Sequence, residues 1–378
     1  MTIESNSEFY PDYAAEHPGA VLEWMLGERG IKKVEFADRC GRPTKTISEI
    51  ISGKSAIMPD TALQFERVLG ESAQFWLRLE AKYQLEQARE RDRAAAQTRS
   101  VADWVKLFPF GDMVKLCFLQ PASGTAAKFD ALLRFFGVSS IMAWNRYWQN
   151  RMSFAKLKQH THHSIDAYAV AAWLRRGEII GDGIVTKPYD EKTFRAALVV
   201  IRSLTVHPWE DIKATLIDVA ADAGVAIALV PMLPKTGLRG AASWMRKDKA
   251  LIILSDYYKC EERVWFSFFH EAAHILLHSK KAVFVDYKED GSAEDEIEQE
   301  ADSFSAEALI PKSAIIEFTK RYGRGKKKYS EPMLREFADS IDISPGLLLA
   351  RLQFDGIISQ KTSLNRSLRR PLNFADSC

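Results

Sequence analysis

The sequence shows no long apolar run, no closely spaced pair of cysteines and no pattern typical of a secretion signal. None of its apolar stretches approaches the roughly 20 residues that a membrane-spanning helix needs. The first residues, MTIESNSEFYPDY, are acidic and lack the charged-then-apolar order of a secretion signal. The four cysteines lie too far apart to form a CxxC metal pair or a dense disulfide framework: Cys40, Cys117, Cys260 and Cys378. We therefore expect a cytoplasmic protein without a membrane segment.

The basic and acidic residues of the whole chain nearly balance, so an excess of either sign is absent. The formal net charge is only +2, so any nucleic-acid footprint has to be local. Hydrophobic residues make up 47% and charged residues 27%, close to the averages for soluble globular proteins, which excludes a largely disordered chain. A length of 378 residues predicts two to three domains.

The pattern along the chain predicts a multi-domain protein that is mainly α, with an α+β part near its C-terminal end. This prediction rests first on apolar positions at helical spacing in the earlier part of the chain. Short apolar runs at 224–233 and 250–255 favour strands, and helices follow near 261–278 and 293–310. The basic tail from 365 is expected to be loosely ordered. The predicted domains are 1–95 (helical), 96–205 (helical middle region), 206–320 (α+β domain) and 321–378 (helical element and basic tail).

Residues 32–54, KKVEFADRCGRPTKTISEIISGK, have the spacing of a helix-turn-helix. The first helix is predicted over 33–40 and carries the small side chain of Ala37 where a second helix must approach. Gly41 supplies the turn, and Pro43 suits the first turn of the second helix. A small helical bundle with a solvated basic face is the alternative that this pattern leaves open.

The second predicted helix has one apolar and one polar face. Ile47, Ile50 and Ile51 cluster on the first, while Lys45 and Glu49 point away from it. Basic charge is concentrated here, because residues 29–54 carry a net +4 against +2 for the whole chain. Such a face suits the major groove, with basic residues near phosphates.

Residues 17–85 resemble the XRE-type helix-turn-helix of the HigA family of antitoxins, above all in ISEIISGK and FWLRLEAKY. The resemblance implies a homodimer that binds a palindromic operator in double-stranded DNA. It also places Thr44, Lys45 and Glu49 at base edges, and Arg42 and Lys54 at phosphates.

The segment 264–278, VWFSFFHEAAHILLH, contains an HExxH motif. His270 and His274, four residues apart, share one helix face and can reach one metal ion. Zn²⁺ suits two imidazoles and one carboxylate, with a fourth position for water. Glu271 would serve as the general base toward that water. A helix with incidental histidines is the plainer alternative.

The third ligand is expected from the acidic helix near 293–311. His278 lies about 12 Å along an unbroken helix from His270, too far to share its metal. We expect His278 to support the site from outside or to sit at the helix end. A helical wheel centred on Ile297, Ala301, Phe304 and Ala308 turns Asp295, Glu298 and Asp302 outward. It leaves three flanking candidates and does not choose among them: Glu294, Glu300 and Glu307.

Residues 206–355 resemble the ImmA/IrrE family of zinc metallopeptidases, in ASWMRKDKALIILS, FHEAAHILLH and EADSFSAEALIP. The resemblance implies a small gluzincin-like α+β domain and assigns the acidic zinc ligand to Glu300. It also implies a substrate strand that adds to a sheet edge, for which ALIILS (250–255) is the candidate.

Two further patterns are given structural interpretations. The histidines at 160, 162 and 163 are predicted to lie in a surface loop or helix cap, since two histidines at i, i+2 do not share a helix face and no cysteine or acidic cluster supports them. Residues 333–357 repeat the helix-turn-helix spacing, but their second helix, LLLARLQ, is apolar and is predicted to be buried.

Together these patterns predict a DNA-binding regulator, of the toxin-antitoxin or stress-response type, that carries a zinc endopeptidase. The peptidase would cleave a repressor or antitoxin protein, and a RelE-like toxin is a further partner by analogy. The alternative is a HigA-like repressor whose zinc domain is structural or senses a ligand.

Overall fold

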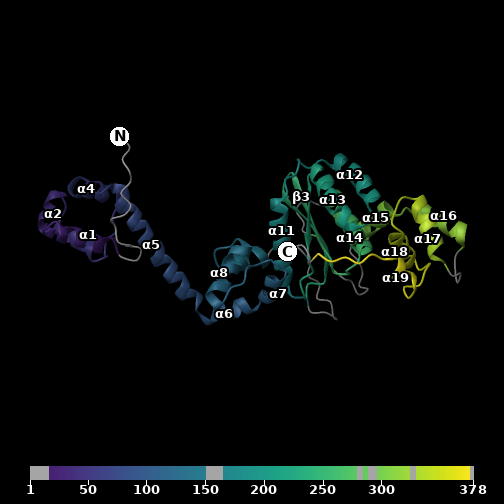
Figure 1. Ribbon diagram of the computed structural model, residues 1–378, viewed down its shortest axis with the longest axis horizontal. Coiled ribbons are helices and arrows are strands. Elements are labelled where there is room, and N and C mark those ends of the chain that lie inside the picture. Colours follow the sequence, from purple (N-terminus) through teal and green to yellow (C-terminus); the bar gives the residue numbers. More distant parts are fainter. Residues whose placement is uncertain (1–16, 150–164, 279–283, 288–295, 324–328, 375–378) are drawn as a thin grey trace. The chain divides into compact units, whose positions relative to one another are not determined.

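The computed structural model describes residues 17–149, 165–278, 284–287, 296–323 and 329–374. The chain divides into two compact units, Met1–Ala102 and Asp103–Cys378, called here the N-terminal and C-terminal units. Figure 1 shows the elements of each. The prediction of a mainly α protein with an α+β part is confirmed.

The N-terminal unit is a helical bundle around a single core. Its helices are α1 (Pro18–Glu28), α2 (Lys33–Arg39), α3 (Thr44–Ile51), α4 (Pro59–Leu69) and α5 (Ala73–Ala96). Phe36, Phe65 and Trp76 are fully buried at its centre and meet through their ring edges. Helix α6 (Arg99–Lys106) spans the boundary between the two units.

Helices α2 and α3 form the predicted helix-turn-helix. Ala37 is fully buried, and Gly41 adopts a φ of +63° that other residues rarely take. The backbone N–H of Arg42 donates to the carbonyl of Ala37 at 2.9 Å and closes the turn. Pro43 is the N-cap of α3, one residue before the position predicted for it.

The C-terminal unit contains a small sheet and the remaining helices. The helices before the sheet are α7 (Phe110–Lys115), α8 (Thr125–Phe136), α9 (Ile141–Trp144), η1 (Asn145–Gln149), α11 (Ala167–Gly183), α12 (Glu191–Leu204) and α13 (Trp209–Asp222). The strands are β1 (Val225–Val230), β2 (Leu238–Arg246), β3 (Lys249–Ser255) and β4 (Phe284–Tyr287). The other helices are α14 (Glu261–Leu277), α15 (Glu296–Leu309), α16 (Lys312–Tyr322), α17 (Glu331–Ser340), α18 (Pro345–Phe354) and α19 (Leu364–Leu368).

The strands form one sheet in the order β1-β3-β2-β4. β2 and β3 form a hairpin around Lys247 and Asp248, and β1 runs parallel to β3. The prediction that 250–255 forms a free edge is wrong, because β3 pairs with a strand on each side. Its seven positions are all buried, as is usual for an apolar run in the middle of a covered sheet.

The two faces of β3 contact different helices. Ala250, Ile252 and Leu254 belong to the main core, which α13 and α14 share, whereas Leu251 and Ile253 face α11. Figure 1 shows α11 and α14 on opposite sides of the sheet. The sheet is thus a middle layer, and α14 is held against it over most of its length.

The close approach of α11 depends on two glycines one helical turn apart. A Cβ atom on Gly177 would lie 2.3 Å from Ile253 Cδ1, and one on Gly181 would lie 2.7 Å from Leu251 Cδ1. Since the sheet packs directly on α11, the middle region predicted over 96–205 shares a compact unit with the sheet. The four-part division of the chain remains a prediction.

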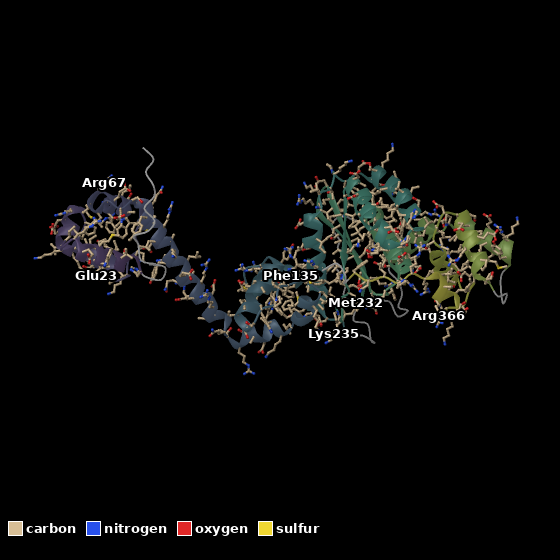
Figure 2. The ribbon with its side chains drawn as sticks, viewed as in Figure 1. Glu23, Arg67, Phe135, Met232, Lys235 and Arg366 are labelled. Carbon is tan, nitrogen blue, oxygen red and sulfur yellow. The ribbon has the colours of Figure 1, made fainter. Side chains whose placement is uncertain are left out.

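Aromatic side chains hold the helices that precede the sheet. Trp144 stacks on Tyr168 of α11 at a centroid separation of 5.0 Å, and Phe108 meets both rings edge-on. Arg175 Nε donates to the carbonyl of Phe135 at 2.8 Å, which ties α8 to α11. Phe135 is buried and is labelled among the side chains of this part in Figure 2.

The last described residues pack onto the unit, which corrects the expectation of a loosely ordered tail. Leu368, Leu372 and Phe374 are buried. The Arg370 guanidinium donates to the carbonyls of His207 and Val206 at 2.7 and 2.9 Å.

The two other structural interpretations have different outcomes. Helix α18 is buried along most of its length, including Leu347, Leu348, Leu349 and Leu352, which confirms the prediction for 333–357. The histidines at 160, 162 and 163 lie outside the described residues. No helix in the described part of the chain combines the length and apolar character that crossing a bilayer requires.

Candidate metal centre and DNA-binding helix

The HEAAH turn lies in the middle of α14, between the sheet and α15. Because α14 is covered on both sides, it is apolar almost all round, and its few polar residues are enclosed. His270, Glu271 and His274 are 4%, 0% and 1% exposed. Polar groups buried so completely need partners, and Glu298 and Asp302 of α15 are among those of the two histidines.

Two imidazoles and one carboxylate converge at this turn. His270 Nε2 lies 3.0 Å from His274 Nε2, and Glu298 Oε2 lies 3.1 and 3.6 Å from these two nitrogens. Glu298 reaches them from the first turns of α15. Among the described residues, these three form the group of potential ligands that one metal ion could join.

The spacing of the three atoms fits Zn²⁺. Ligands bonded at 2.0–2.1 Å in a tetrahedron are separated by about 3.3 Å. The observed separations of 3.0, 3.1 and 3.6 Å bracket that value. Two histidines and a glutamate also leave the fourth position open, as in catalytic rather than structural zinc sites.

The protonation states at the site also suit a metal. Burial lowers the pKa of His274 and so favours its neutral ring. Burial alone would raise the pKa of Glu298, but hydrogen bonds from His270 and His274 outweigh it and lower the pKa. Neutral imidazoles and an ionised carboxylate are the forms that bind metal ions.

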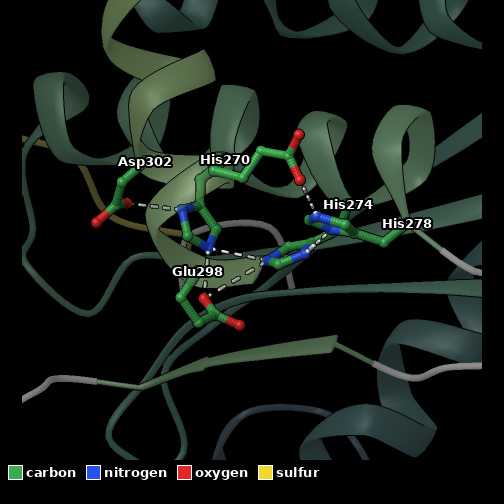
Figure 3. A network of polar contacts seen from close by, with 6 residues as sticks. His270, His274, His278, Glu298 and Asp302 are labelled. Atoms are coloured by element: carbon green, nitrogen blue, oxygen red, sulfur yellow. Dashed lines mark hydrogen bonds and ion pairs between the residues drawn. The ribbon is translucent and has the colours of Figure 1, made fainter. Parts of the chain in front are cut away.

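A second ring of contacts fixes the imidazoles. Asp302 Oδ1 lies 2.8 Å from His270 Nδ1, on the side of the ring away from the other two ligand atoms. His278 Nδ1 lies 2.9 Å from His274 Nδ1. Figure 3 shows Glu298 and Asp302 at different edges of the His270 ring and His278 beside His274. Such contacts orient metal-binding histidines and set which nitrogen carries the proton.

The structure places Glu300 outside the group of three. Its Oε2 lies 3.2 Å from His278 Nε2, and its side chain is 59% exposed against 31% for Glu298. The structure therefore replaces Glu300 with Glu298 as the candidate carboxylate. His278 has the supporting place predicted for it, beside the imidazole pair.

The choice of Glu300 depends on which face of α15 is buried. A helical wheel centred on Ile297 and Phe304 gives the wrong face, because Ile297 is 40% exposed. The buried residues of α15 are Ala301, Ser305 and Leu309, one turn apart. Ser305 Oγ donates to the carbonyl of Phe266 on α14 at 3.0 Å, which confirms that this face meets α14.

Glu298 and Asp302, which the helical wheel turns outward, therefore become candidate site residues. They stand four apart and flank Ala301, so they share the face that meets α14. The small residues Ala301 and Ser305 are the signal that could have identified it, because helices approach most closely where side chains are small.

Glu271 points toward the sheet. A Cβ atom on Gly240 of β2 would lie 2.5 Å from Glu271 Oε1 and 2.9 Å from its Cγ. The glycine thus leaves space that the glutamate occupies. The role of Glu271 as a base remains a prediction.

The residues predicted to contact DNA lie on or beside α3. Lys45 and Lys54 are exposed, and Thr44 and Glu49 are half-buried. Lys45 Nζ lies 3.8 Å from Glu49 Oε1. Arg42 Nε donates to Gln64 Oε1 of α4, which fixes the guanidinium at the edge of α3.

Comparisons with known proteins match both units. Residues 22–76 match the helix-turn-helix family model, and residues 227–353 match that of the IrrE N-terminal-like domain, a peptidase family. The second match includes α14 and α15, and the first includes α2 and α3.

Curated relatives match the N-terminal unit. The chain is 39% identical over 71 residues to virulence-associated protein A of Dichelobacter nodosus, which is 18% of this chain and 70% of the relative. It is 32% identical over 71 residues to the helix-turn-helix transcriptional regulator YddM of Escherichia coli, covering 19% of this chain and 76% of the relative.

Solved structures match the same region. One is the antitoxin HigA of Pseudomonas aeruginosa with the higBA promoter, at 28% identity and a TM-score of 0.21, covering 22% of this chain and 90% of that one. Another is an antidote protein of a HigA family from Coxiella burnetii, at 26% identity and a TM-score of 0.21, covering 22% and 92%. The family models and curated relatives show that the chain belongs to the XRE-type helix-turn-helix proteins and carries an IrrE N-terminal-like peptidase domain.

Proposed function

We propose that this regulator is a zinc-dependent endopeptidase that acts while bound to DNA. The observation that carries the proposal is the convergence of His270, His274 and Glu298, with separations that fit tetrahedral zinc ligands. The family match to a peptidase domain over 227–353 supports it.

The residues of the site have distinct tasks in this proposal. His270, His274 and Glu298 hold the ion, and Asp302 fixes the His270 ring through Nδ1. Zn²⁺, when bound there, supplies Lewis-acid polarisation of a water and of the peptide carbonyl. Glu271 accepts the proton of the attacking water and passes it to the leaving amine.

The N-terminal unit supplies the DNA-binding function. The family match to a helix-turn-helix supports a reading role for α3, with Thr44, Lys45 and Glu49 at base edges and Arg42 and Lys54 at phosphates. A homodimer on a palindromic operator is part of the proposal, since symmetric half-sites suit symmetric proteins.

The proposed substrate is a repressor or antitoxin protein, including another copy of this chain. DNA binding would bring the peptidase close to a repressor on the same operator and raise its local concentration. A RelE-like toxin is a further proposed partner, and the cytoplasm is the proposed location.

Glu271→Gln tests the proposal directly. The variant should keep zinc content and DNA affinity but lose cleavage of a co-expressed repressor, because glutamine cannot take up the proton. Glu317→Gln, an exposed acidic position on α16, is the matched control and should cleave normally. Unchanged cleavage by Glu271→Gln would contradict the catalytic proposal.

A second function is favoured by the burial of Glu271. The Glu271 side chain is 0% exposed, which is typical of a structural residue, whereas a general base has to meet water. In that case the chain is a HigA-like repressor whose zinc domain is structural or senses a ligand. Unchanged gene regulation in cells carrying Glu271→Gln would support it.

A further inference from the structure

A pocket lies between α14, α15 and α18, on the far side of His270 from its contact with His274. Its walls are mainly apolar and include Phe266, Leu309 and Leu347. Asp302, the carboxylate that fixes His270 through Nδ1, is part of the lining. The pocket therefore reaches the outer side of the imidazole pair, not the nitrogens that face a metal.

A buried carboxylate in this pocket has one oxygen without a partner. Glu262 is 3% exposed, and its Oε1 accepts the backbone N–H of Arg370 at 3.0 Å. Its Oε2 is buried and has no hydrogen-bond partner among the described residues. Burial raises the pKa of Glu262, which shows how poorly the fold itself solvates this group. A buried acceptor left unmet destabilises the fold, so a donor brought by a ligand would be favourable.

Two further features of the lining indicate what a ligand would carry. Arg263 lies over the Tyr258 ring at 5.0 Å, and its guanidinium forms no ion pair within the described part of the chain. Phe354 is 69% exposed although it lines the pocket, with its ring 6.4 Å from that of Phe266. A cation and an exposed aromatic ring favour an anion with an apolar body.

Arg351 has a different role in the wall. Its Nη1 donates to the carbonyls of Ala306 and Ile310 at 2.8 and 3.0 Å, and its Nε pairs with Asp355 at 2.9 Å. These contacts hold α18 against the end of α15. The pocket is thus built on fixed helices, as small-molecule sites usually are.

We propose that this pocket binds a small organic anion that has an apolar body and an N–H or O–H donor. The donor pairs with Glu262 Oε2, the anionic group lies at Arg263, and the apolar body packs between Phe266 and Leu347. Since Asp302 lines the same pocket, an occupant contacts the carboxylate that holds His270. The pocket goes beyond the proposed peptidase function and does not depend on it.

Anilinonaphthalene sulfonate is a suitable probe, because it combines aromatic rings, an N–H and a sulfonate. Titrated with the full-length protein, it should show one saturable fluorescent site per chain. Ala350→Phe fills the pocket and should abolish that site, whereas Ala214→Phe, on an exposed face of α13, should retain it.

Two milder variants test the polar contacts without filling the pocket. Glu262→Gln can still accept from Arg370 but turns an N–H₂ toward the probe, and should weaken binding about tenfold. Arg263→Gln should weaken it as well, and thermal unfolding should show that both variants fold. A titration without saturation, or a saturable site that both variants and Ala350→Phe leave unchanged, would overturn the proposal. The titration uses neither metal nor peptide, so its failure would leave the peptidase proposal intact.

Discussion

Glu298 and Glu300 stand two positions apart on α15, and this small step decides which carboxylate meets the imidazoles. We predict that Glu298→Ala lowers zinc affinity by about 100-fold or more, because a direct ligand should matter at least as much as the outer contacts that cost 10–100-fold. The carboxylate of Glu300 contacts His278 alone among the described histidines. The Glu300→Ala variant should therefore bind zinc nearly as the wild type does. Competition with a chromogenic chelator measures both, and equal losses in the two variants would contradict the assignment.

Gly240 controls the position of Glu271. We predict that Gly240→Ala abolishes or strongly reduces peptide cleavage while zinc content stays normal, because a Cβ atom would lie 2.5 Å from Glu271 Oε1 and displace it. Gly237, where a Cβ meets nothing within 4 Å, has a φ of +64° and is a poor control. Gly27→Ala, in open space on α1, is the better one. Normal cleavage by Gly240→Ala would show that Glu271 does not need this position.

At this scale the sequence predicted the residues that a local rule determines. His270 and His274 follow from a spacing of one helical turn, which holds in any α-helix. Glu298 does not follow in this way, because its position depends on how α15 is rotated against α14. That rotation is set by the packing of Ala301 and Ser305, which a wheel centred on apolar side chains overlooked.

Among the elements, α11 packs closely on the sheet through Gly177 and Gly181. We predict that Gly177→Ala lowers the free energy of unfolding by about 1–3 kcal/mol, since the added methyl would overlap Ile253 in a filled core. Gly183→Ala, on the same helix with open space at its Cβ, should be neutral or slightly stabilising. Denaturant midpoints measure the difference, and equal effects in the two variants would show that the sheet adjusts freely.

The DNA-binding helix gives a prediction in terms of salt. Lys54→Ala should weaken binding to any duplex and reduce the slope of log affinity against log salt by about one, as the loss of one phosphate contact requires. Lys82→Ala, an exposed position on α5 away from the helix-turn-helix, should leave the slope unchanged. Fluorescence anisotropy at several salt concentrations measures it, and an unchanged slope for Lys54→Ala would remove this residue from the interface.

Elements were predicted well where one periodicity dominates. Helices α2 and α14 and strands β1 and β3 have boundaries close to those predicted, because apolar spacing and turn residues agree there. The order of strands was not predicted. Whether 250–255 lies at an edge depends on the parallel pairing with Val225–Val230, a contact between distant segments that no local pattern reports.

On the scale of the whole molecule, each unit has its own core. The core of the N-terminal unit centres on residues such as Phe36 and Trp76, and the main core of the C-terminal unit centres on residues such as Trp265 and Phe268. Metal binding should therefore stabilise one unit alone. We predict that a chelator lowers the melting temperature of the C-terminal unit, because an ion that binds only the folded form adds about 4 kcal/mol at a thousand-fold excess over Kd.

The same chelation should leave DNA affinity unchanged. Calorimetry would show one transition shifted and the other constant, and anisotropy would show the same binding curve with and without metal. A joint shift of both transitions, or a loss of DNA binding, would contradict the independence of the two units.

The packing of α11 on the sheet has a practical consequence for the design of shorter fragments of this protein. A fragment that starts at the boundary of the peptidase family match would lack α11, and the side chains of Leu251 and Ile253 would face water. Such a fragment would carry a bare apolar layer and tend to aggregate during expression. A shortened protein therefore has to begin upstream of Ala167, so that the sheet and the candidate metal centre keep the helix they fold with.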